Sequence, residues 1–209
     1  MIFPDAFGSF VCSVSNNLSY PTLFCSWESP QPAFKLQATI VQAVRATSAA
    51  PTFFRGVNIV GQAGLSHSFI DGGIRANNPV KYVLDEARIL SPASEIDYVL
   101  SLGTGALSAM RIGADFMFKG FRASNVSLVE AQARIATDCE AIAEEVGRSF
   151  SDTPGVYYRL SVDRGLQDVF LSEWDKVGDV SAHTLQYIRT VAIVEKVDRL
   201  VEKLTTDTT

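Results

Sequence analysis

The chain alternates short β-prone runs with stretches in which apolar residues recur at helical spacing. Phe10–Val14 is the first β-prone run, and turn-forming residues follow at positions 15–19, so we predict a buried strand that leaves into a loop. A core-facing helix is predicted for residues 35–50, where Pro51 ends the pattern. Its expected buried positions repeat every three or four residues: Leu36, Ile40, Ala43 and Val44.

Two further strands are predicted between residues 68 and 105. Residues 68–70 form a short β-prone run that enters the turn Asp71-Gly72-Gly73, where two glycines permit a positive φ and close backbone approach. Residues 96–102 are also strand-like, and this run ends at Gly103-Thr104-Gly105.

Three helices and one strand are predicted after the Asp71 turn. Asn78 and Pro79 suit the N-cap and first position of a helix, whose apolar face comprises Val80, Val83, Leu84 and Ala87. A long amphipathic helix from Ser124 to Gly147, its expected C′ residue, has the stripe Leu128, Ala131, Ile135, Cys139, Ile142 and Val146. A strand follows with the alternating positions Val156, Tyr158, Leu160 and Val162. The last helical stripe, which packs on its own domain or alternatively binds a partner, is Leu185, Ile188, Ala192, Val194, Val197, Val201 and Leu204.

Strands that alternate with helices predict an α/β fold in which helices cover a mostly parallel or mixed sheet. With 209 residues, 47% of them hydrophobic, the chain is long enough to bury a substantial core. It contains no internal repeat and no low-complexity linker. We therefore expect one globular domain.

Charge and cysteine content narrow the classes of partner. A formal net charge of -5 without any block of Lys or Arg argues against a nucleic-acid partner. Cys12, Cys25 and Cys139 lack the spacing of a disulfide framework or a zinc site, so we expect reduced thiols in the cytoplasm.

The sequence does not predict a signal peptide or a membrane span. No basic residue precedes Lys35, and Pro4 and Asp5 interrupt the first apolar residues. No apolar run approaches the roughly 18 residues that a spanning helix needs. Any membrane contact is therefore expected to be peripheral.

The Asp71-Gly72-Gly73 turn gains significance from the sequence on both sides. Residues 43–54, Ala-Val-Arg-Ala-Thr-Ser-Ala-Ala-Pro-Thr-Phe-Phe, precede it, and Asn77-Asn78-Pro79 and residues 101–105 follow it. This combination resembles the patatin-like phospholipase family over residues 10–105, and residues 157–159 and 165–168 look like its fungal members. The resemblance implies that residues 1–110 are the C-terminal part of a three-layer patatin-like catalytic domain. Residues 111–209 are then a helical extension with one or two strands, packed on the same domain.

The resemblance implies a lipid acyl hydrolase that uses a serine–aspartate dyad and no cofactor. The family's catalytic aspartate corresponds to Asp71, and Gly72 and Gly73 complete its motif. A carboxylate within hydrogen-bond reach of a serine hydroxyl can accept its proton as the oxygen attacks an ester carbonyl. The implied substrates are carboxylic esters of phospholipids or neutral lipids.

Two parts of the family's machinery have no counterpart in these 209 residues: the nucleophile elbow Gly-x-Ser-x-Gly and the Gly-rich oxyanion loop. Gly64-Leu65-Ser66-His67-Ser68 comes nearest to the elbow, but its fifth residue is Ser. Ser66 is expected to be a polar loop residue. The chain by itself is therefore expected to be inactive, as the product of a lost N-terminal half, and poorly soluble.

Other residues are weaker candidates for chemistry. His67 and His183 lack a third close metal ligand, so we expect ordinary surface or core roles and no metal. The Gly103 turn is expected to be a strand end, although nucleotide binding there is a distant alternative. Arg45 and Arg75 are expected to be solvated or locally paired, with a lipid headgroup as the alternative. For the whole chain, the competing function is a non-catalytic remnant that binds lipid or another protein.

Overall fold

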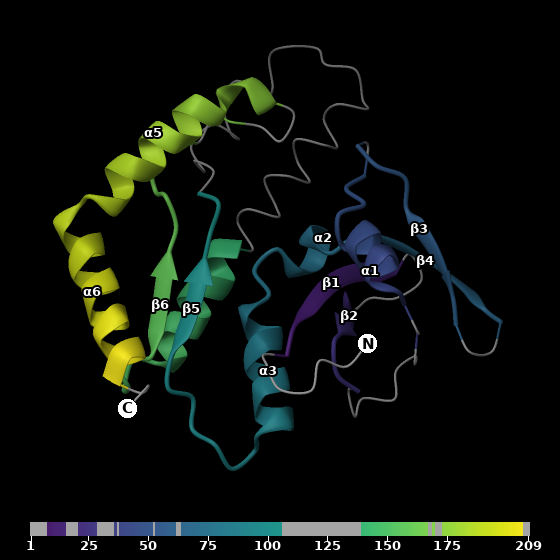
Figure 1. Ribbon diagram of the computed structural model, residues 1–209, viewed down its shortest axis with the longest axis horizontal. Coiled ribbons are helices and arrows are strands. Elements are labelled where there is room, and N and C mark those ends of the chain that lie inside the picture. Colours follow the sequence, from purple (N-terminus) through teal and green to yellow (C-terminus); the bar gives the residue numbers. More distant parts are fainter. Residues whose placement is uncertain are drawn as a thin grey trace. The chain divides into compact units, whose positions relative to one another are not determined.

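The computed structural model describes residues 8–15, 21–28, 36, 38–51, 53–61, 64–105, 139–166, 169 and 173–206. The chain forms two compact units, Met1–Pro79 and Val80–Thr209, and each is considered by itself (Figure 1). The expected boundary between residues 110 and 111 lies outside the described residues and remains a prediction.

The first unit contains a four-stranded antiparallel sheet. Its strands have the spatial order β2-β1-β4-β3, and every neighbouring pair is antiparallel. The bounds are Phe10–Ser15 for β1, Pro21–Cys25 for β2, Val57–Val60 for β3 and Ser66–Asp71 for β4. Residues 10–14 and 68–70, which were predicted as strands, lie in β1 and β4.

The expectation of a mostly parallel or mixed sheet is wrong for this unit, and two of its three strand pairs have connections too short for a parallel arrangement. Residues 16–20 join β1 to β2, and residues 61–65 join β3 to β4. A parallel pair requires a crossover of a dozen residues or more, whereas five residues suffice to join antiparallel neighbours. The overall class is mixed α/β, as predicted.

Helix α1, Ile40–Thr47, begins at a capping box. The Thr39 N–H donates to Gln42 Oε1 at 2.8 Å, and the Gln42 N–H donates to Thr39 Oγ1 at 3.2 Å. This pair of bonds satisfies N–H groups that a helix start leaves without partners. The helix is therefore shorter than the predicted span of residues 35–50.

The predicted orientation of α1 is also wrong. Ile40 and Val44 were expected in the core, but they are 61% and 53% exposed, whereas Ala46 is fully buried. Ala46 packs with Val57, Ile59 and Phe69 on the sheet. The buried face is set by the small side chain that fits against the strands, and the larger aliphatic side chains of α1 face solvent.

The second unit contains a parallel pair of strands together with several helices. Its elements are α3 Val80–Leu90, β5 Val99–Leu102, a helical segment at 139–149, β6 Tyr157–Leu160, the 3₁₀ helix η2 Trp174–Lys176, α5 Val177–Ile188 and α6 Val191–Thr206. β5 and β6 are parallel from Val99↔Tyr157 to Leu102↔Leu160. The core cluster comprises Val80, Leu84, Val99 and Val146. The strands predicted near residues 96–102 and 156–162 and the helix after Pro79 are confirmed.

Two predicted helix boundaries differ in this unit. Gly147 lies inside the helical segment 139–149 instead of ending it. The last apolar stripe belongs to two helices, α5 and α6, which are separated at Arg189 and Thr190. The predicted part of the long helix from Ser124 to residue 138 lies outside the described residues.

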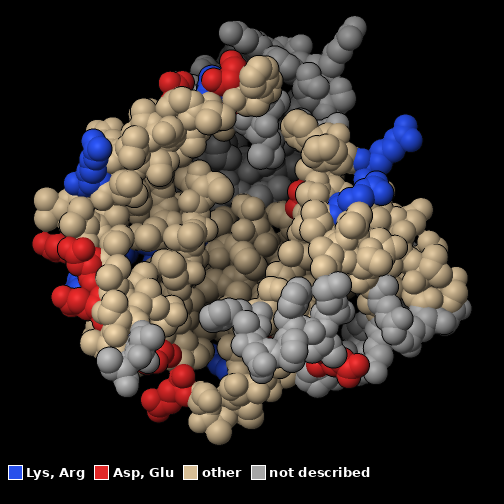
Figure 2. Space-filling model, viewed as in Figure 1, with Lys and Arg blue, Asp and Glu red and all other residues tan. Residues whose placement is uncertain are grey.

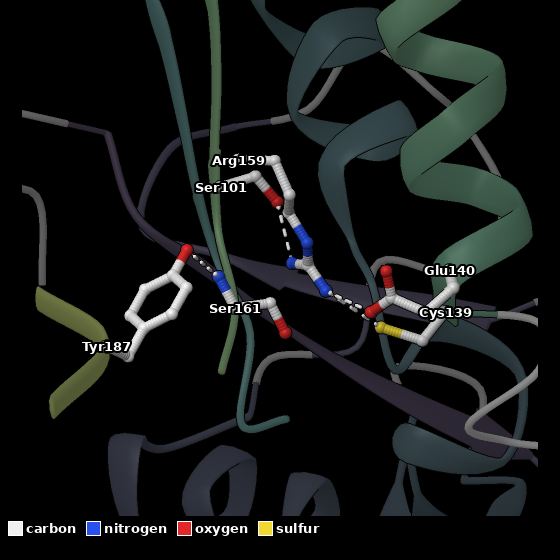
Figure 3. A network of polar contacts seen from close by, with 6 residues as sticks. All are labelled: Ser101, Cys139, Glu140, Arg159, Ser161 and Tyr187. Atoms are coloured by element: carbon white, nitrogen blue, oxygen red, sulfur yellow. Dashed lines mark hydrogen bonds and ion pairs between the residues drawn. The ribbon is translucent and has the colours of Figure 1, made fainter. Parts of the chain in front are cut away.

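A polar network joins β5, β6, the helical segment 139–149 and α5 (Figure 3). Arg159 Nη1 donates to Ser101 Oγ at 3.1 Å, and Arg159 Nη2 donates to Glu140 Oε1 at 2.9 Å. The Ser161 N–H donates to the hydroxyl oxygen of Tyr187 at 3.1 Å. Because the Arg159 side chain is only 14% exposed, its bonds to both partners are shielded from water.

Candidate active site

Asp71 is the last residue of β4, and two neighbouring elements fix its backbone. Its N–H donates to the carbonyl oxygen of Ala49 at 3.0 Å, at the exit of α1. On the other side, Asp71 lies opposite Ser13 in the β1–β4 pairing. The Ala-rich end of α1 and the Asp71 turn, predicted to belong to one motif, are therefore in direct contact.

The carboxylate of Asp71 is oriented by the residue that begins α2, Gly73–Ala76. The Gly73 N–H donates to Asp71 Oδ1 at 2.6 Å. Within the described part of the chain, no hydrogen bond reaches Oδ2. A Cβ at position 73 would lie 3.1 Å from Asp71 Oδ1, so glycine leaves the held oxygen uncrowded. The carboxylate thus has one fixed oxygen and one that is open to a donor.

Gly72 is required for close approach and not for an unusual backbone conformation. Its φ of -63° and ψ of -26° are helical, so the positive φ that glycine permits is not used at this position. A Cβ on Gly72 would collide with the carbonyl oxygen of Cys12 and lie 2.5 Å from its carbonyl carbon. Position 72 therefore excludes every side chain, because β1 passes directly beside it.

Ser13 anchors β1 to both β4 and α1. Its Oγ lies 2.7 Å from the Ile70 carbonyl oxygen and 3.1 Å from the Ala46 carbonyl oxygen, and the residue is fully buried. Thr47 Oγ1 adds a second tie, donating to the carbonyl oxygen of Cys12 at 2.6 Å. Neither tie was predicted. Ser13 was known only as a serine within the β-prone run of residues 10–14, and Thr47 only as part of the Ala-rich stretch of residues 43–54.

Cys12 lies beside the turn but is not an activated nucleophile. Burial, with a smaller contribution from the Cys25 thiol, raises the pKa of the Cys12 thiol to about 11. The thiol therefore stays protonated at neutral pH, and the thiolate is the reactive form. Within the described part of the chain, Cys12, Cys25 and Cys139 form no disulfide.

Ser66 does not reach Asp71. It is an exposed residue at the start of β4, where it pairs with Val60, and Asp71 is at the other end of the same strand. Five residues of extended strand span roughly 16 Å, and positions an odd number apart face opposite sides of a sheet. Ser66 is a strand residue instead of the expected loop residue, and this geometry argues against its pairing with Asp71.

The histidines and the Gly103 turn occupy structural positions. The His67 ring lies 6.5 Å from the Phe69 ring, and a Cβ at Gly165 would lie 2.5 Å from His183 Cγ. Where the structure describes the chain, no three His, Cys, Asp or Glu residues are grouped to hold a metal. The Gly103 N–H donates to the Leu160 carbonyl oxygen at 2.8 Å, as a strand-end turn does, and that N–H is not available to a phosphate.

The remaining residues of the predicted motifs differ in exposure, and two of them are not among the described residues. Arg45, Arg75 and Asn77 are exposed, and Asn78 is buried. Gln167 and Asp168, from the motif that resembles fungal members, are not among the described residues. Among the described helices, none is both long enough and apolar enough to cross a bilayer.

The segment of the chain that contains the Asp71 turn is similar to a known protein family. Residues 20–84 match the family model described as patatin-like phospholipase. This span includes α1, β4 and the whole Asp71-Gly72-Gly73 turn. The family match and the geometry of the turn therefore concern the same residues.

Individual relatives extend the similarity. The chain is 33% identical over 94 residues to "Phospholipase A I" of Arabidopsis thaliana, covering 41% of this chain and 7% of that protein. It is 37% identical over 102 residues to "Patatin-like protein 2" of the same plant, covering 41% and 25%. It is 26% identical over 189 residues to the "85/88 kDa calcium-independent phospholipase A2" of Rattus norvegicus, covering 81% and 21%. The aligned parts span a quarter or less of each of these relatives.

Proposed function

We propose that this chain carries the general base of a serine–aspartate lipid acyl hydrolase and that Asp71 is this base, since residues 20–84 match the patatin-like phospholipase family model. The substrates are carboxylic esters of phospholipids or neutral lipids. The observation that supports this role is the seating of the carboxylate. Gly73 holds Oδ1 at 2.6 Å, and Oδ2 accepts no hydrogen bond from the described residues.

The proposed reaction proceeds through an acyl-serine. Asp71 takes the proton of the serine hydroxyl while the serine oxygen attacks the ester carbonyl carbon. The bond to the alcohol then breaks, and the departing oxygen takes the proton from Asp71. In the second half, Asp71 deprotonates a water that attacks the acyl-serine, which releases the fatty acid and restores the serine hydroxyl. A carboxylate that is already oriented lowers the cost of both proton transfers.

The nucleophile is the missing participant. The 209 residues contain no Gly-x-Ser-x-Gly, and losing even one oxyanion donor costs about 3 kcal/mol of transition-state stabilisation. We propose that the 209-residue chain does not turn over by itself, and that the serine and the oxyanion loop are supplied by a longer polypeptide. We also place the protein in the cytoplasm, with peripheral access to membranes.

The test compares two lengths of the protein with a fluorophosphonate probe that labels activated serines. A polypeptide that carries the upstream nucleophile should be labelled and should hydrolyse phospholipid or triacylglycerol esters. The 209-residue chain should not be labelled. In the longer polypeptide, Asp71→Asn should abolish turnover while the circular dichroism spectrum is retained. The matched control is Asp85→Asn, which alters an exposed carboxylate on α3 that lies 3.5 Å from Arg88 Nη1.

Different results would contradict different parts of the proposal. Turnover that survives Asp71→Asn would exclude Asp71 as the base. Labelling of the 209-residue chain would show that it holds its own nucleophile. If no polypeptide with an upstream Gly-x-Ser-x-Gly is made, the chain is a non-catalytic member of the family.

A further inference from the structure

Large apolar side chains are exposed along α1 and the turn that follows it. Ile40, Val41 and Val44 are 61%, 69% and 53% exposed, and Phe53 and Phe54 are 40% and 68% exposed. Phe53 and Phe54 stay close to the end of α1, because the backbone N–H groups of both residues donate to the carbonyl oxygen of Ala50. We name these five residues the α1 surface. Exposed apolar residues scattered singly are ordinary, but a group of this kind marks an interaction site.

The aliphatic residues lie on one side of α1. Successive helical residues are rotated by about 100°, so Ile40, Val41 and Val44 fall within roughly 100° of one another. The opposite side of the helix carries Ala46, which is fully buried against the sheet. The helix therefore turns its smallest residue inward and its larger apolar residues outward, the reverse of the arrangement that core packing alone favours.

The charge around this surface is basic, although the chain as a whole is acidic. Residues 29–70 contain Lys35, Arg45 and Arg55 and no Asp or Glu, a net of +3 in a chain of net charge -5. Arg45 and Arg55 are both exposed. Figure 2 shows blue basic side chains projecting on the side of the first unit where Figure 1 draws α1 and the approach to β3.

We propose that the α1 surface docks on an anionic lipid bilayer, with Ile40, Val41, Val44, Phe53 and Phe54 entering the interface and Arg45 and Arg55 contacting the headgroups. Apolar residues beside Arg, without acidic neighbours in the segment, are the composition that binds the interface of an anionic membrane. The inference rests on the proposed function only in naming lipid as the partner. Vesicle binding requires no turnover, so it is measured separately from catalysis.

The surface lies in the same unit as the proposed base and is joined to it through the backbone. The Asp71 N–H donates to Ala49, which immediately follows the C-cap of α1. Docking through α1 would therefore hold the unit that carries the Asp71 turn at the bilayer that contains its ester substrates. This arrangement gives the exposed aliphatic residues a role that core packing does not.

The test is co-sedimentation of the 209-residue chain with vesicles of phosphatidylcholine, either alone or mixed with phosphatidylglycerol. We expect binding to the mixed vesicles that weakens as salt increases, and weaker binding to phosphatidylcholine alone. The double variant Arg45→Gln/Arg55→Gln should bind the mixed vesicles about 25-fold more weakly, since each basic residue near an anionic surface contributes about fivefold. The control is Arg148→Gln/Arg164→Gln, which removes two exposed arginines of the second unit.

A second pair of variants tests the apolar contacts. Val41→Asp/Phe54→Ser should lose binding without loss of fold, because Val41 is the second residue of α1, where a carboxylate suits the helix dipole. The control Val191→Asp alters an equally exposed valine at the start of α6 and should bind normally. The proposal would be overturned if Val41→Asp/Phe54→Ser still binds the mixed vesicles. It would also be overturned if each control variant weakens binding as much as the variant it is paired with. A third result would also overturn it: the unaltered chain self-associates, Val41→Asp/Phe54→Ser abolishes this self-association, and no vesicle binding is seen. The α1 surface would then bind a second copy of the chain.

Discussion

Ser13 lies directly opposite Asp71 in the antiparallel pairing of β1 with β4, yet its hydroxyl is bonded elsewhere. Its Oγ lies 2.7 Å from the carbonyl oxygen of Ile70 and 3.1 Å from that of Ala46. The single hydroxyl proton can go to either carbonyl, and the fully buried residue offers no access to an ester. A serine adjacent to the proposed base is therefore a structural tie and not its nucleophile.

Ser13→Ala should lower the free energy of unfolding by about 1 to 3 kcal/mol, because it removes a buried hydrogen bond and leaves carbonyl groups without that donor. Urea unfolding of the 209-residue chain measures this change. Ser151→Ala, at an exposed position, is the control and should change stability by less than about 0.5 kcal/mol. A Ser13→Ala protein as stable as the control would mean that the hydroxyl contributes nothing to the junction.

Gly72→Ala should destabilise the first unit by about 1 to 3 kcal/mol or more, the usual range for overpacking. The atoms that a Cβ would meet belong to the backbone of Cys12, which cannot move without disturbing β1. Gly178→Ala is the matched control, since a Cβ there meets nothing within 4 Å and the position is helical. The control should be neutral or stabilising by up to about 1 kcal/mol. Equal effects of the two substitutions on urea unfolding would contradict the steric explanation for Gly72.

Local pattern was sufficient to place most of the elements. β-prone runs marked β1, β4, β5 and β6, and the Asn78-Pro79 signal marked the start of α3 within two residues. The direction of the first sheet was not predicted, because strand and helix alternation was weighted above connection length. Two links of five residues make the outer pairs β2–β1 and β4–β3 antiparallel. Strands β2 and β3 were not anticipated.

The orientation of α1 depended on a tertiary contact. Periodicity identified an amphipathic helix, but it assigned the core to Ile40 and Val44. In the fold, Ala46 meets the sheet and its carbonyl oxygen lies 3.1 Å from Ser13 Oγ. A small residue is favoured where the helix approaches the strands closely. No local sequence rule indicates which face of the helix will make that approach.

The sequence supplied Asp71 as the candidate residue, whose role stays a prediction, but it did not supply the contacts around that residue. Asp71 was identified from its motif, whose partner Gly73 holds the carboxylate through a backbone N–H. The contacts that fix the Asp71 turn from outside the turn itself run through the Ala49 carbonyl, which accepts from the Asp71 N–H, and through the Ser13 hydroxyl, which lies 2.7 Å from the Ile70 carbonyl oxygen. Backbone acceptors carry no sequence signal, because every residue has one.

Gly103→Ala should destabilise the second unit by about 1 to 3 kcal/mol. A Cβ at position 103 would collide with Arg159 Nη2 and lie 2.6 Å from Ser161 Oγ. Arg159 is unable to yield freely, because Glu140 holds it at 2.9 Å. Gly147→Ala is the comparison, since its Cβ meets only Tyr157 at 3.8 Å within a helical segment and should stabilise by up to about 1 kcal/mol. Thermal or urea unfolding distinguishes the two, and a neutral Gly103→Ala would show that the Arg159 network tolerates rearrangement.

Stability at high pH should depend on Cys12. Burial, with a smaller effect of Cys25, raises the pKa of the Cys12 thiol from 9.0 to about 11. A group whose pKa is higher in the folded state contributes stability that is complete below the unfolded pKa and is lost as pH rises through the folded one. The loss should therefore develop between about pH 9 and about pH 11. Two pKa units correspond to about 3 kcal/mol at most.

The measurement is urea unfolding of the unaltered chain and of Cys12→Ala at about pH 8, below that transition, and at about pH 10.5, within its upper part. Tyrosines and lysines also titrate in this range, so the informative quantity is the difference between the two proteins at each pH. Cys12→Ala should be the less stable protein at the lower pH, because it leaves a small cavity beside Gly72. The difference in stability between the two proteins should narrow or reverse at the higher pH. There the Cys12 thiol ionises more readily in the unfolded chain than in the folded one, and only the unaltered protein has this thiol. A gap that stays constant across the two pH values would mean that the Cys12 thiol is hydrated enough to ionise in place.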